Sequence, residues 1–289
     1  MRWAALLCFA FLLVPRAGWG SAIAEGDAAW ERRAEGRSGL RARPEAISEA
    51  IAAYERAISE SPESLEAYWK LLRALWFAGD FASPNRAEER SRYERGKQVA
   101  ERGFGILAAR AGGRDALDST PARDLPGRIP EADRADAARL YFWSAVNVAA
   151  WSRVAGLLQA VREGVANRLH RETERAVALD AGLEEGGPLR LLSRLHAELP
   201  KVPLLSGFVD RSLAMPLAER ALREHAKHPG NPFLLGLTIL ELVPERREEG
   251  LGLLERTARI EPRPGHEIED LAIREEAIER LQKEGRSPI

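Results

Sequence analysis

The sequence predicts an all-α fold of stacked helix pairs, and a repeated residue spacing is the main observation behind that prediction. Two sets of four residues, about 200 positions apart, share successive steps of 4, 3 and 5: Ala50, Tyr54, Ala57 and Pro62, and Gly250, Leu254, Thr257 and Pro262. The first two steps place three residues of each set on one stripe of a helix. Small residues there let another helix approach, and the proline ends the helix because it has no N–H group to donate. This spacing is typical of the second half of a tetratricopeptide repeat.

Composition supports the same fold class. Of the 289 residues, 45% are hydrophobic and 30% are charged, which argues against a disordered chain and against one embedded in a membrane. Long alternating runs of Val, Ile and Thr are missing, so strands have little support. We therefore expect a tetratricopeptide-like helical-repeat solenoid of about four helix pairs with a C-terminal capping helix, whose outer face meets water.

The N-terminus has the pattern of an export signal. Arg2 supplies a positive charge, and Trp3 to Val14 form an apolar run of 12 residues, shorter than the roughly 20 needed to span a bilayer. Small residues follow, and we expect cleavage after Gly20 or Ala24. No later run is comparably apolar, so we expect a mature chain without a transmembrane segment, located in the periplasm.

The only cysteine, Cys8, lies inside this apolar run and not at a cleavage point, which argues against a lipoprotein. Removal of the segment leaves no thiol for a disulfide or a thiolate metal site. It also takes away two basic residues and no acidic one, which leaves a formal charge of −3. No long basic run stands out, so nucleic acid is not expected as a partner.

Apolar stripes and helix breakers divide the chain into a signal peptide (residues 1–24) and a single helical domain (residues 25–289). The expected helices are 45–59, 63–78, 85–111, 133–156, 157–179, a short one from 188, 210–227, one from 232, 246–260 and 267–283. Gly and Pro are frequent in 112–131, which predicts a loop or an irregular insertion. Small residues at Gly96, Gly103 and Gly236 predict close approach of neighbouring helices.

No motif predicts catalysis, a metal site or a cofactor. G-x-S-x-G is absent, and no glycine-rich segment stands after a strand, as nucleotide binding would need. His225 and His228 share a helix face, but two ligands leave a zinc site incomplete. Adjacent carboxylates such as Glu184–Glu185 suit a solvated face better than acid–base chemistry. We expect a protein that is not an enzyme.

Large aromatic residues are the better candidates for binding a ligand or a partner. The candidates are Trp69, Trp76, Phe77, Tyr141, Phe142, Trp143, Asn147 and Trp151. The first three fall off the packing stripe of helix 63–78, toward the concave groove, or they pack under the insertion or the N-terminal lead-in. For the aromatics of helix 133–156 core packing is favoured, although four large rings within 11 residues cannot all face one side.

The segment Tyr141-Phe142-Trp143-Ser144-Ala145-Val146-Asn147, followed by Trp151, resembles the aromatic helix of the T-component (TatT) family associated with TRAP transporters. The segments that follow are also similar in order: Arg175–Asp180, then Gly186-Gly187-Pro188 with a leucine helix closed by Pro200, and Leu217–Leu222 before Pro229 and Asn231. The similarity covers roughly residues 45–262.

This resemblance implies an exported accessory protein of tripartite ATP-independent transport. Such proteins are thought to associate with the periplasmic solute-binding subunit, to contain a hollow that accommodates a ligand, and to lack catalysis of their own. Members are often lipoproteins, and the position of Cys8 departs from that pattern. The alternative function is a generic repeat scaffold for cell-envelope assembly or secretion. Self-association through the repeat ends is a further expectation, since stacked repeats leave their ends to be capped or paired.

Overall fold

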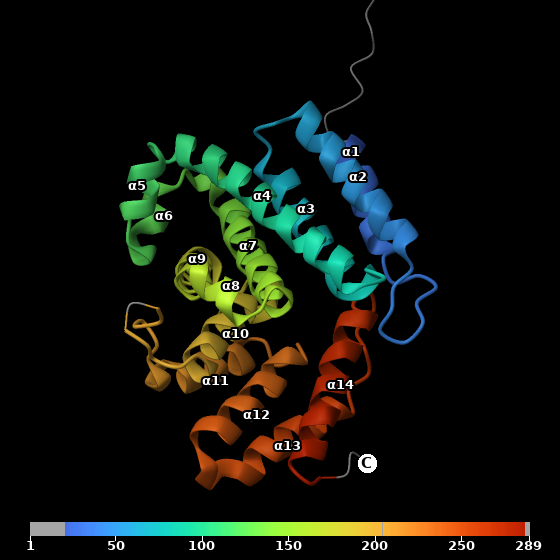
Figure 1. The fold of residues 1–289 in the computed structure, drawn as a ribbon, viewed down its shortest axis with the longest axis vertical. Helices are drawn as coiled ribbons and strands as arrows, with labels where there is room; N and C mark the ends of the chain where they lie inside the picture. Colours follow the sequence, from blue (N-terminus) through green and yellow to red (C-terminus); the bar gives the residue numbers. More distant parts are fainter. Residues whose placement is uncertain (1–20, 204, 287–289) are drawn as a thin grey trace, which may run out of the picture.

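The computed structural model describes residues 21–203 and 205–286, and within these residues the chain is all-α, with fourteen α-helices and no strand (Figure 1). Among the described helices, none combines the length and apolar character that a membrane span requires. The predicted signal peptide lies outside the described residues up to Gly20. Helix α1 (Ser21–Glu31) begins at the next residue, so cleavage after Gly20 would leave α1 whole, whereas cleavage after Ala24 would remove its first turn.

The N-terminal half is a stack of long helices, each packed mainly on its neighbours in the sequence. Its long members are α1, α2 (Pro44–Glu60), α3 (Leu65–Phe77), α4 (Arg86–Arg110), α7 (Arg134–Ala155) and α9 (Val165–Asp180). The predicted stripe of α2 is confirmed, because Ala50, Tyr54 and Ala57 are all buried. The helix starts follow local chemistry: Pro44 opens α2, and the side chain of Asn85 accepts hydrogen bonds from the first N–H groups of α4.

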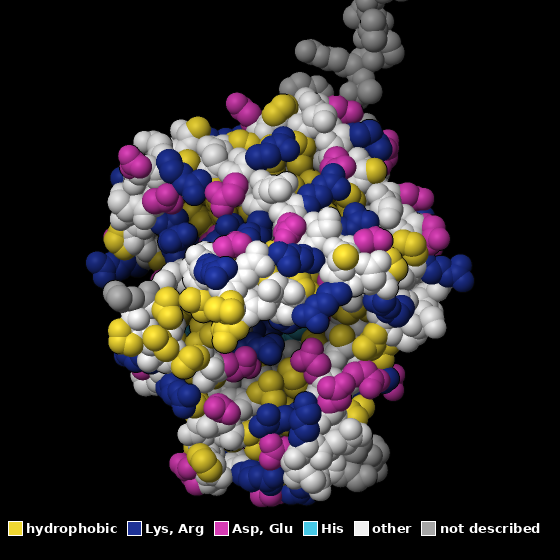
Figure 2. All heavy atoms as spheres, in the orientation of Figure 1, with side chains coloured by type: hydrophobic (Ala, Val, Ile, Leu, Met, Phe, Trp, Pro, Cys, Tyr) yellow, Lys and Arg dark blue, Asp and Glu magenta, His cyan; other side chains and the backbone are white. Residues whose placement is uncertain are grey.

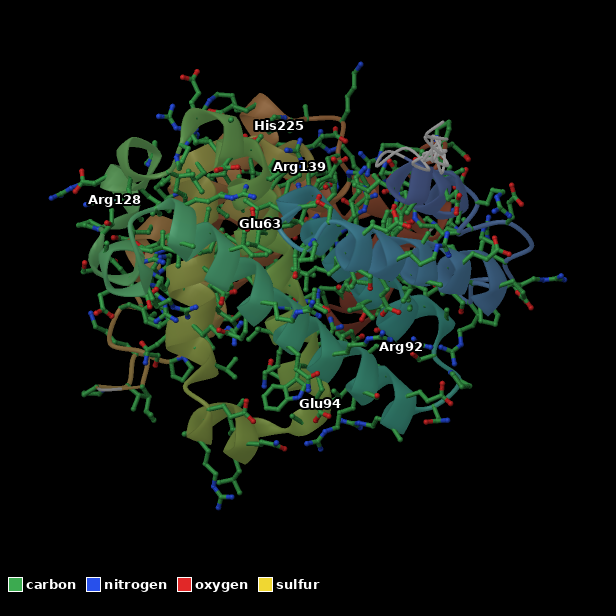
Figure 3. All side chains as sticks on the ribbon, turned by 90° about the horizontal axis from the view of Figure 1, so that it is seen from above. Glu63, Arg92, Glu94, Arg128, Arg139 and His225 are labelled. Carbon is green, nitrogen blue, oxygen red and sulfur yellow. The ribbon has the colours of Figure 1, made fainter. Side chains whose placement is uncertain are left out.

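The insertion predicted at 112–131 contains two short helices, α5 (Arg114–Ser119) and α6 (Leu125–Arg128). It is tied to the stack by Arg175 of α9, which donates hydrogen bonds to the backbone oxygens of Leu117 and Asp118 and to the hydroxyl of Tyr141. Charged side chains cover the outside of this half, and Figure 3 shows Arg128 of α6 and Glu94 of α4 at its periphery.

The prediction of one continuous helix over 157–179 is wrong. Gly164 has a φ of 64° and separates α8 (Leu157–Arg162) from α9. The predicted shared face is therefore split: Val165 and Leu169 are buried, whereas Leu158 on α8 is 75% exposed. A glycine in the left-handed region ends α8 at little steric cost, and the turn carries the apolar residues of α8 away from the core.

The C-terminal half continues the stack and then returns to the first helices. Its members are α10 (Leu183–Glu198), α11 (Ala214–Glu224), α12 (Gly230–Leu242), α13 (Arg247–Ala258) and α14 (Glu267–Lys283). Helix α14, red in Figure 1, extends back toward the region of α1 and α3. Ile268 in its first turn is fully buried in the hydrophobic core of the N-terminal half.

An ion pair also joins α14 to the segment that follows α1. Arg33, just after α1, is only 2% exposed and donates hydrogen bonds from Nε and Nη2 to Oε1 of Glu269 at 2.9 and 2.8 Å. It also donates to the backbone oxygens of Trp30 and Gly265. The predicted capping helix therefore covers α13 on one side and contacts the segment just after α1 on the other.

Two of the predicted small-residue positions meet each other. An added Cβ atom on Gly236 of α12 would lie 2.9 Å from the backbone oxygen of Gly250 on α13, and one on Gly250 would lie 3.1 Å from the backbone oxygen of Gly236. Gly103 of α4 likewise faces Leu140 of α7. The spacing that suggested repeats thus marks real points of close helix contact.

This contact predicts that Gly236→Ala destabilises the protein. The new methyl group would force two backbones apart, at a cost of about 1–3 kcal/mol, only partly offset by the gain of up to about 1 kcal/mol in helix propensity. Gly252→Ala in α13 is the matched control, because nothing lies within 4 Å of its added Cβ. Urea unfolding should show a lower midpoint for the first variant and an equal or higher midpoint for the second; equal shifts would contradict the close contact.

Candidate functional site

The two halves enclose a cavity of about 560 Å³, a size common among small-molecule sites. It lies between α3 and α7 on one side, the start of α10 and the turn before α12 on another, and α14 on the third. The space-filling view shows the surface hollowed in the lower half of the molecule, with Lys, Arg, Asp and Glu side chains around the opening (Figure 2).

One wall of the cavity is aromatic. Trp76 of α3 and Trp143 of α7 lie with ring centroids 5.3 Å apart, and Phe142 adjoins Trp143 at 5.1 Å. Phe81 packs edge-on against Trp76 at 5.8 Å. Phe81 belongs to a π-helical turn, Ala78–Ala82, that extends α3. Such turns are rare in proteins, and those that occur are often located at functional sites.

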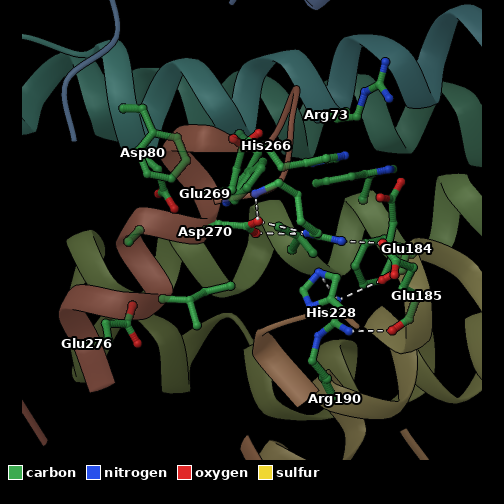
Figure 4. Close-up of a pocket in the computed structure, with 18 of the residues that line it drawn as sticks. Arg73, Asp80, Glu184, Glu185, Arg190, His228, His266, Glu269, Asp270 and Glu276 are labelled. Carbon is green, nitrogen blue, oxygen red and sulfur yellow. Dashed lines mark hydrogen bonds and ion pairs between the residues drawn. The ribbon is translucent and has the colours of Figure 1, made fainter. Parts of the chain in front are cut away.

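The facing wall is charged, and most of its charges are paired. Arg263, in the loop before α14, donates from Nε and Nη2 to the two carboxylate oxygens of Asp270 at 2.9 Å each, and it also pairs with Glu185. On the side of α3 and α7, Arg153 pairs with Asp80 at 2.7 Å. Figure 4 shows Asp270 and Glu276 of α14 on one side of the cavity and Glu184, Glu185 and Arg190 of the α10 side opposite them.

The backbone at the start of α10 is strained. Glu184 and Glu185 have φ values of 49° and 50°, in the left-handed region that non-glycine residues seldom occupy, and Gly186 follows at 87°. Arg190 donates hydrogen bonds to the backbone oxygens of Glu184 and Glu185 at 2.9 and 2.7 Å, and Asn231 donates to Glu185 at 3.2 Å. Strain of this kind persists only where the surroundings enforce it, and it is concentrated at functional sites.

His228 lies at the edge of the charged wall. Burial is the main cause that lowers its pKa, and the positive charges of Arg190 and Arg263 add to the effect, bringing the pKa to about 2. Burial also lowers the pKa of Arg190, to about 10, which leaves it charged. The ring of His228 is therefore neutral at physiological pH, while the guanidinium beside it is not.

Three buried polar atoms of lining residues have no hydrogen-bond partner among the described residues. They are Nε of Arg73, Nε1 of Trp143 and Oε2 of Glu269. The guanidinium of Arg73 lies 4.0 Å from the ring centroid of Trp30 and forms no ion pair in the described part of the chain. A buried N–H group without an acceptor is costly, so such groups are expected where a ligand or water supplies the missing partner.

Of the predicted binding residues, Trp76, Phe142 and Trp143 come together in the cavity, and the other five lie elsewhere. Trp69 is buried and donates its indole hydrogen to Asp136 at 2.9 Å. The remaining four are also buried: Phe77 in the core, Tyr141 beside Arg175, Asn147 against the backbone oxygens of Leu72 and Trp143, and Trp151 under Lys97.

Sequence reasoning missed the charged wall. The sequence favours a solvated face for Glu184 and Glu185, and Glu185 is exposed, but the pattern does not reveal that both line a cavity. The sequence offers His228 only as half of a metal pair with His225. The described residues contain no group of three or more potential metal ligands. The sequence signal that was available is the break Glu184-Glu185-Gly186-Gly187, which places two acidic residues where a helix cannot be regular.

Comparisons with known proteins do not assign the chain to a family. No family model matches it, and no curated protein matches it significantly.

The lowered pKa of His228 predicts that the free energy of unfolding decreases when the pH is lowered. In the unfolded chain His228 binds a proton with the ordinary pKa of about 6.5, but in the folded chain its pKa is about 2. Between about pH 6.5 and 5 the unfolded state therefore binds more protons, and the free energy of unfolding decreases as the pH falls, by up to about 1.4 kcal/mol per pH unit. His170, whose pKa burial lowers to about 4, adds to the same slope.

Urea unfolding of the wild type and of His228→Asn across this pH window measures the effect. The variant cannot titrate at this position, so its free energy of unfolding should depend less steeply on pH, by the contribution of about one proton. An identical slope in the two proteins would contradict a neutral His228.

Proposed function

We propose that this chain is an exported, non-enzymatic helical-repeat scaffold that accommodates an apolar solute in its central cavity. The observation that carries the proposal is the cavity itself, of about 560 Å³ and with an aromatic wall formed by Trp76, Phe142 and Trp143. Large aromatic rings on the wall of a cavity supply apolar contact area at little cost in conformational entropy. The sequential stacking of helix pairs and the Gly236–Gly250 contact support a tetratricopeptide-like solenoid, closed here by α14.

We further propose that the protein is a periplasmic accessory component of a TRAP-type transporter and associates with its solute-binding subunit. The support is the N-terminal signal pattern and the resemblance of residues 45–262 to the T-component family. An outer surface suited to a partner is also present: Leu157 and Leu158 on α8 are 81% and 75% exposed. This surface also fits the second candidate, a scaffold for envelope assembly or secretion, because any partner protein could cover it.

The solute proposal predicts different effects for two tryptophans of α3. Trp76→Ala removes a ring that lines the cavity and should weaken the binding of a neutral apolar probe, 1-decanol, by about 2 kcal/mol, or roughly thirtyfold. Trp69→Ala removes an equally large ring that does not line the cavity, and it should leave the affinity unchanged. Calorimetric titration measures both, with circular dichroism as the check on folding. Equal losses in the two variants, or no binding by the wild type, would count against the solute proposal.

The partner proposal predicts co-purification from an envelope extract. The tagged chain should enrich a TRAP solute-binding protein, and the double variant Leu157→Asp/Leu158→Asp should lose that enrichment if α8 is the contact. Enrichment of secretion or outer-membrane assembly proteins would favour the second candidate. Failure to enrich any solute-binding protein under conditions that preserve weak complexes would reject the transporter role.

A further inference from the structure

The ring of His228 has a defined tautomer. The backbone N–H of Gly230 donates a hydrogen bond to its Nδ1 at 3.0 Å. A ring nitrogen that accepts a hydrogen bond carries no proton, so the proton of the neutral ring lies on Nε2. Nε2 of His228 is therefore a hydrogen-bond donor.

That donor faces another donor. Nε2 of His228 lies 3.3 Å from Nη2 of Arg190, and a guanidinium has no acceptor. Nη1 of Arg190 already donates to the backbone oxygen of Glu185 and to Oδ1 of Asn231, and one N–H of Nη2 donates to the backbone oxygen of Glu184. The second N–H of Nη2 and the N–H of His228 are left facing each other at the cavity, without an acceptor in the described part of the chain.

The charges around this pair are mixed. Arg190 forms no ion pair with a carboxylate among the described residues, and Arg263 adds a second positive charge near His228, whereas the carboxylates of Glu184 and Glu185 act on Arg190 with the opposite sign. Two N–H groups that converge, one of them on a charged guanidinium, match an oxyanion, since one oxygen or two oxygens of the same group can accept from both. The strained turn at Glu184–Glu185 fixes Arg190 in this position.

The aromatic wall begins beside the same turn. A Cβ atom added to Gly187 would lie 2.7 Å from Cζ of Phe142, so the ring of Phe142 rests against the backbone that Arg190 holds. From Phe142 the wall continues to Trp143 and then to Trp76. Trp143 is 6% exposed and its Nε1–H has no partner among the described residues, which adds a buried donor on the same wall.

We infer that the cavity binds an amphipathic anion, with its oxyanion head between His228 and Arg190 and its hydrocarbon tail along Phe142, Trp143 and Trp76. This inference rests on the proposed function and names the class of its solute. Acidic side chains outnumber basic ones in the lining. Asp80, Glu185, Glu269 and Asp270 are paired with arginine, and the groups that lack partners at the head site are donors. A carboxylate and a phosphate head share this chemistry.

Calorimetric titration of the purified chain with four ten-carbon probes tests the inference. Decanoate and decyl phosphate carry the two oxyanion heads, 1-decanol carries a neutral head, and decyltrimethylammonium carries a cation. At least one of the two anions should bind about tenfold or more tightly than decanol, because hydrogen bonds to a charged group are the stronger ones. The tighter of the two anions identifies the head.

Two substitutions at one position separate the head site from folding. His228→Asn keeps an acceptor for the N–H of Gly230, in the manner of an Asx turn, but its shorter amide leaves no donor at the position of Nε2. His228→Gln retains an N–H near the position of Nε2. The first should lose the preference for the anion over decanol, and the second should keep most of that preference.

Several results would overturn the inference. Decanol binding as tightly as both anions, or the cation binding most tightly, would reject it and leave the apolar-solute function standing. A preference for the anion that survives in His228→Asn would place the head elsewhere. If none of the four probes binds, the inference and the solute proposal fail together. The comparison among probes on the wild type decides these points even where a variant does not fold.

Discussion

The structure depends on the contact that brings the last helix back to the first. Arg33 is almost fully buried, and it is paired with Glu269, 236 positions later in the sequence. Removing one partner of a buried pair leaves an uncompensated charge, so Arg33 and Glu269 constrain where the start of α14 docks on the N-terminal half. Ile268, buried in the same core, adds an apolar contribution. If α14 did not dock here, the sides of α3 and α7 that now face α14 across the cavity would face solvent.

Closure explains why the cavity has two unlike walls. The rings of Trp76 and Trp143 come from helices of the N-terminal half, whereas Arg190, His228 and Asp270 come from turns and helix ends of the C-terminal half. Helix ends and turns expose backbone donors and acceptors that side chains must satisfy, which is why charged groups gather there. The strained Glu184–Glu185 turn belongs to this second wall, and the hydrogen bonds of Arg190 hold it.

The features that could be predicted from the sequence are those that depend on the local periodicity of apolar and small residues. The all-α class, the buried stripe of α2 and the Gly236–Gly250 contact follow from helix geometry and side-chain size. The single helix over 157–179 was wrong because one glycine, Gly164, took a left-handed conformation that a stripe of apolar residues does not reveal. Trp69 and Trp76 could not be separated, since both lie off the stripe and only the return of α14 decides which one borders a cavity. The charged wall needs contacts between residues far apart in sequence, and no local pattern encodes those.

Small-angle X-ray scattering of residues 21–289 tests the closed arrangement most directly. A closed domain of this length should have a radius of gyration of about 18 Å and a single-peaked distance distribution. A clearly larger radius with the extended tail of an open superhelix would contradict the account, because the two walls would then not face each other.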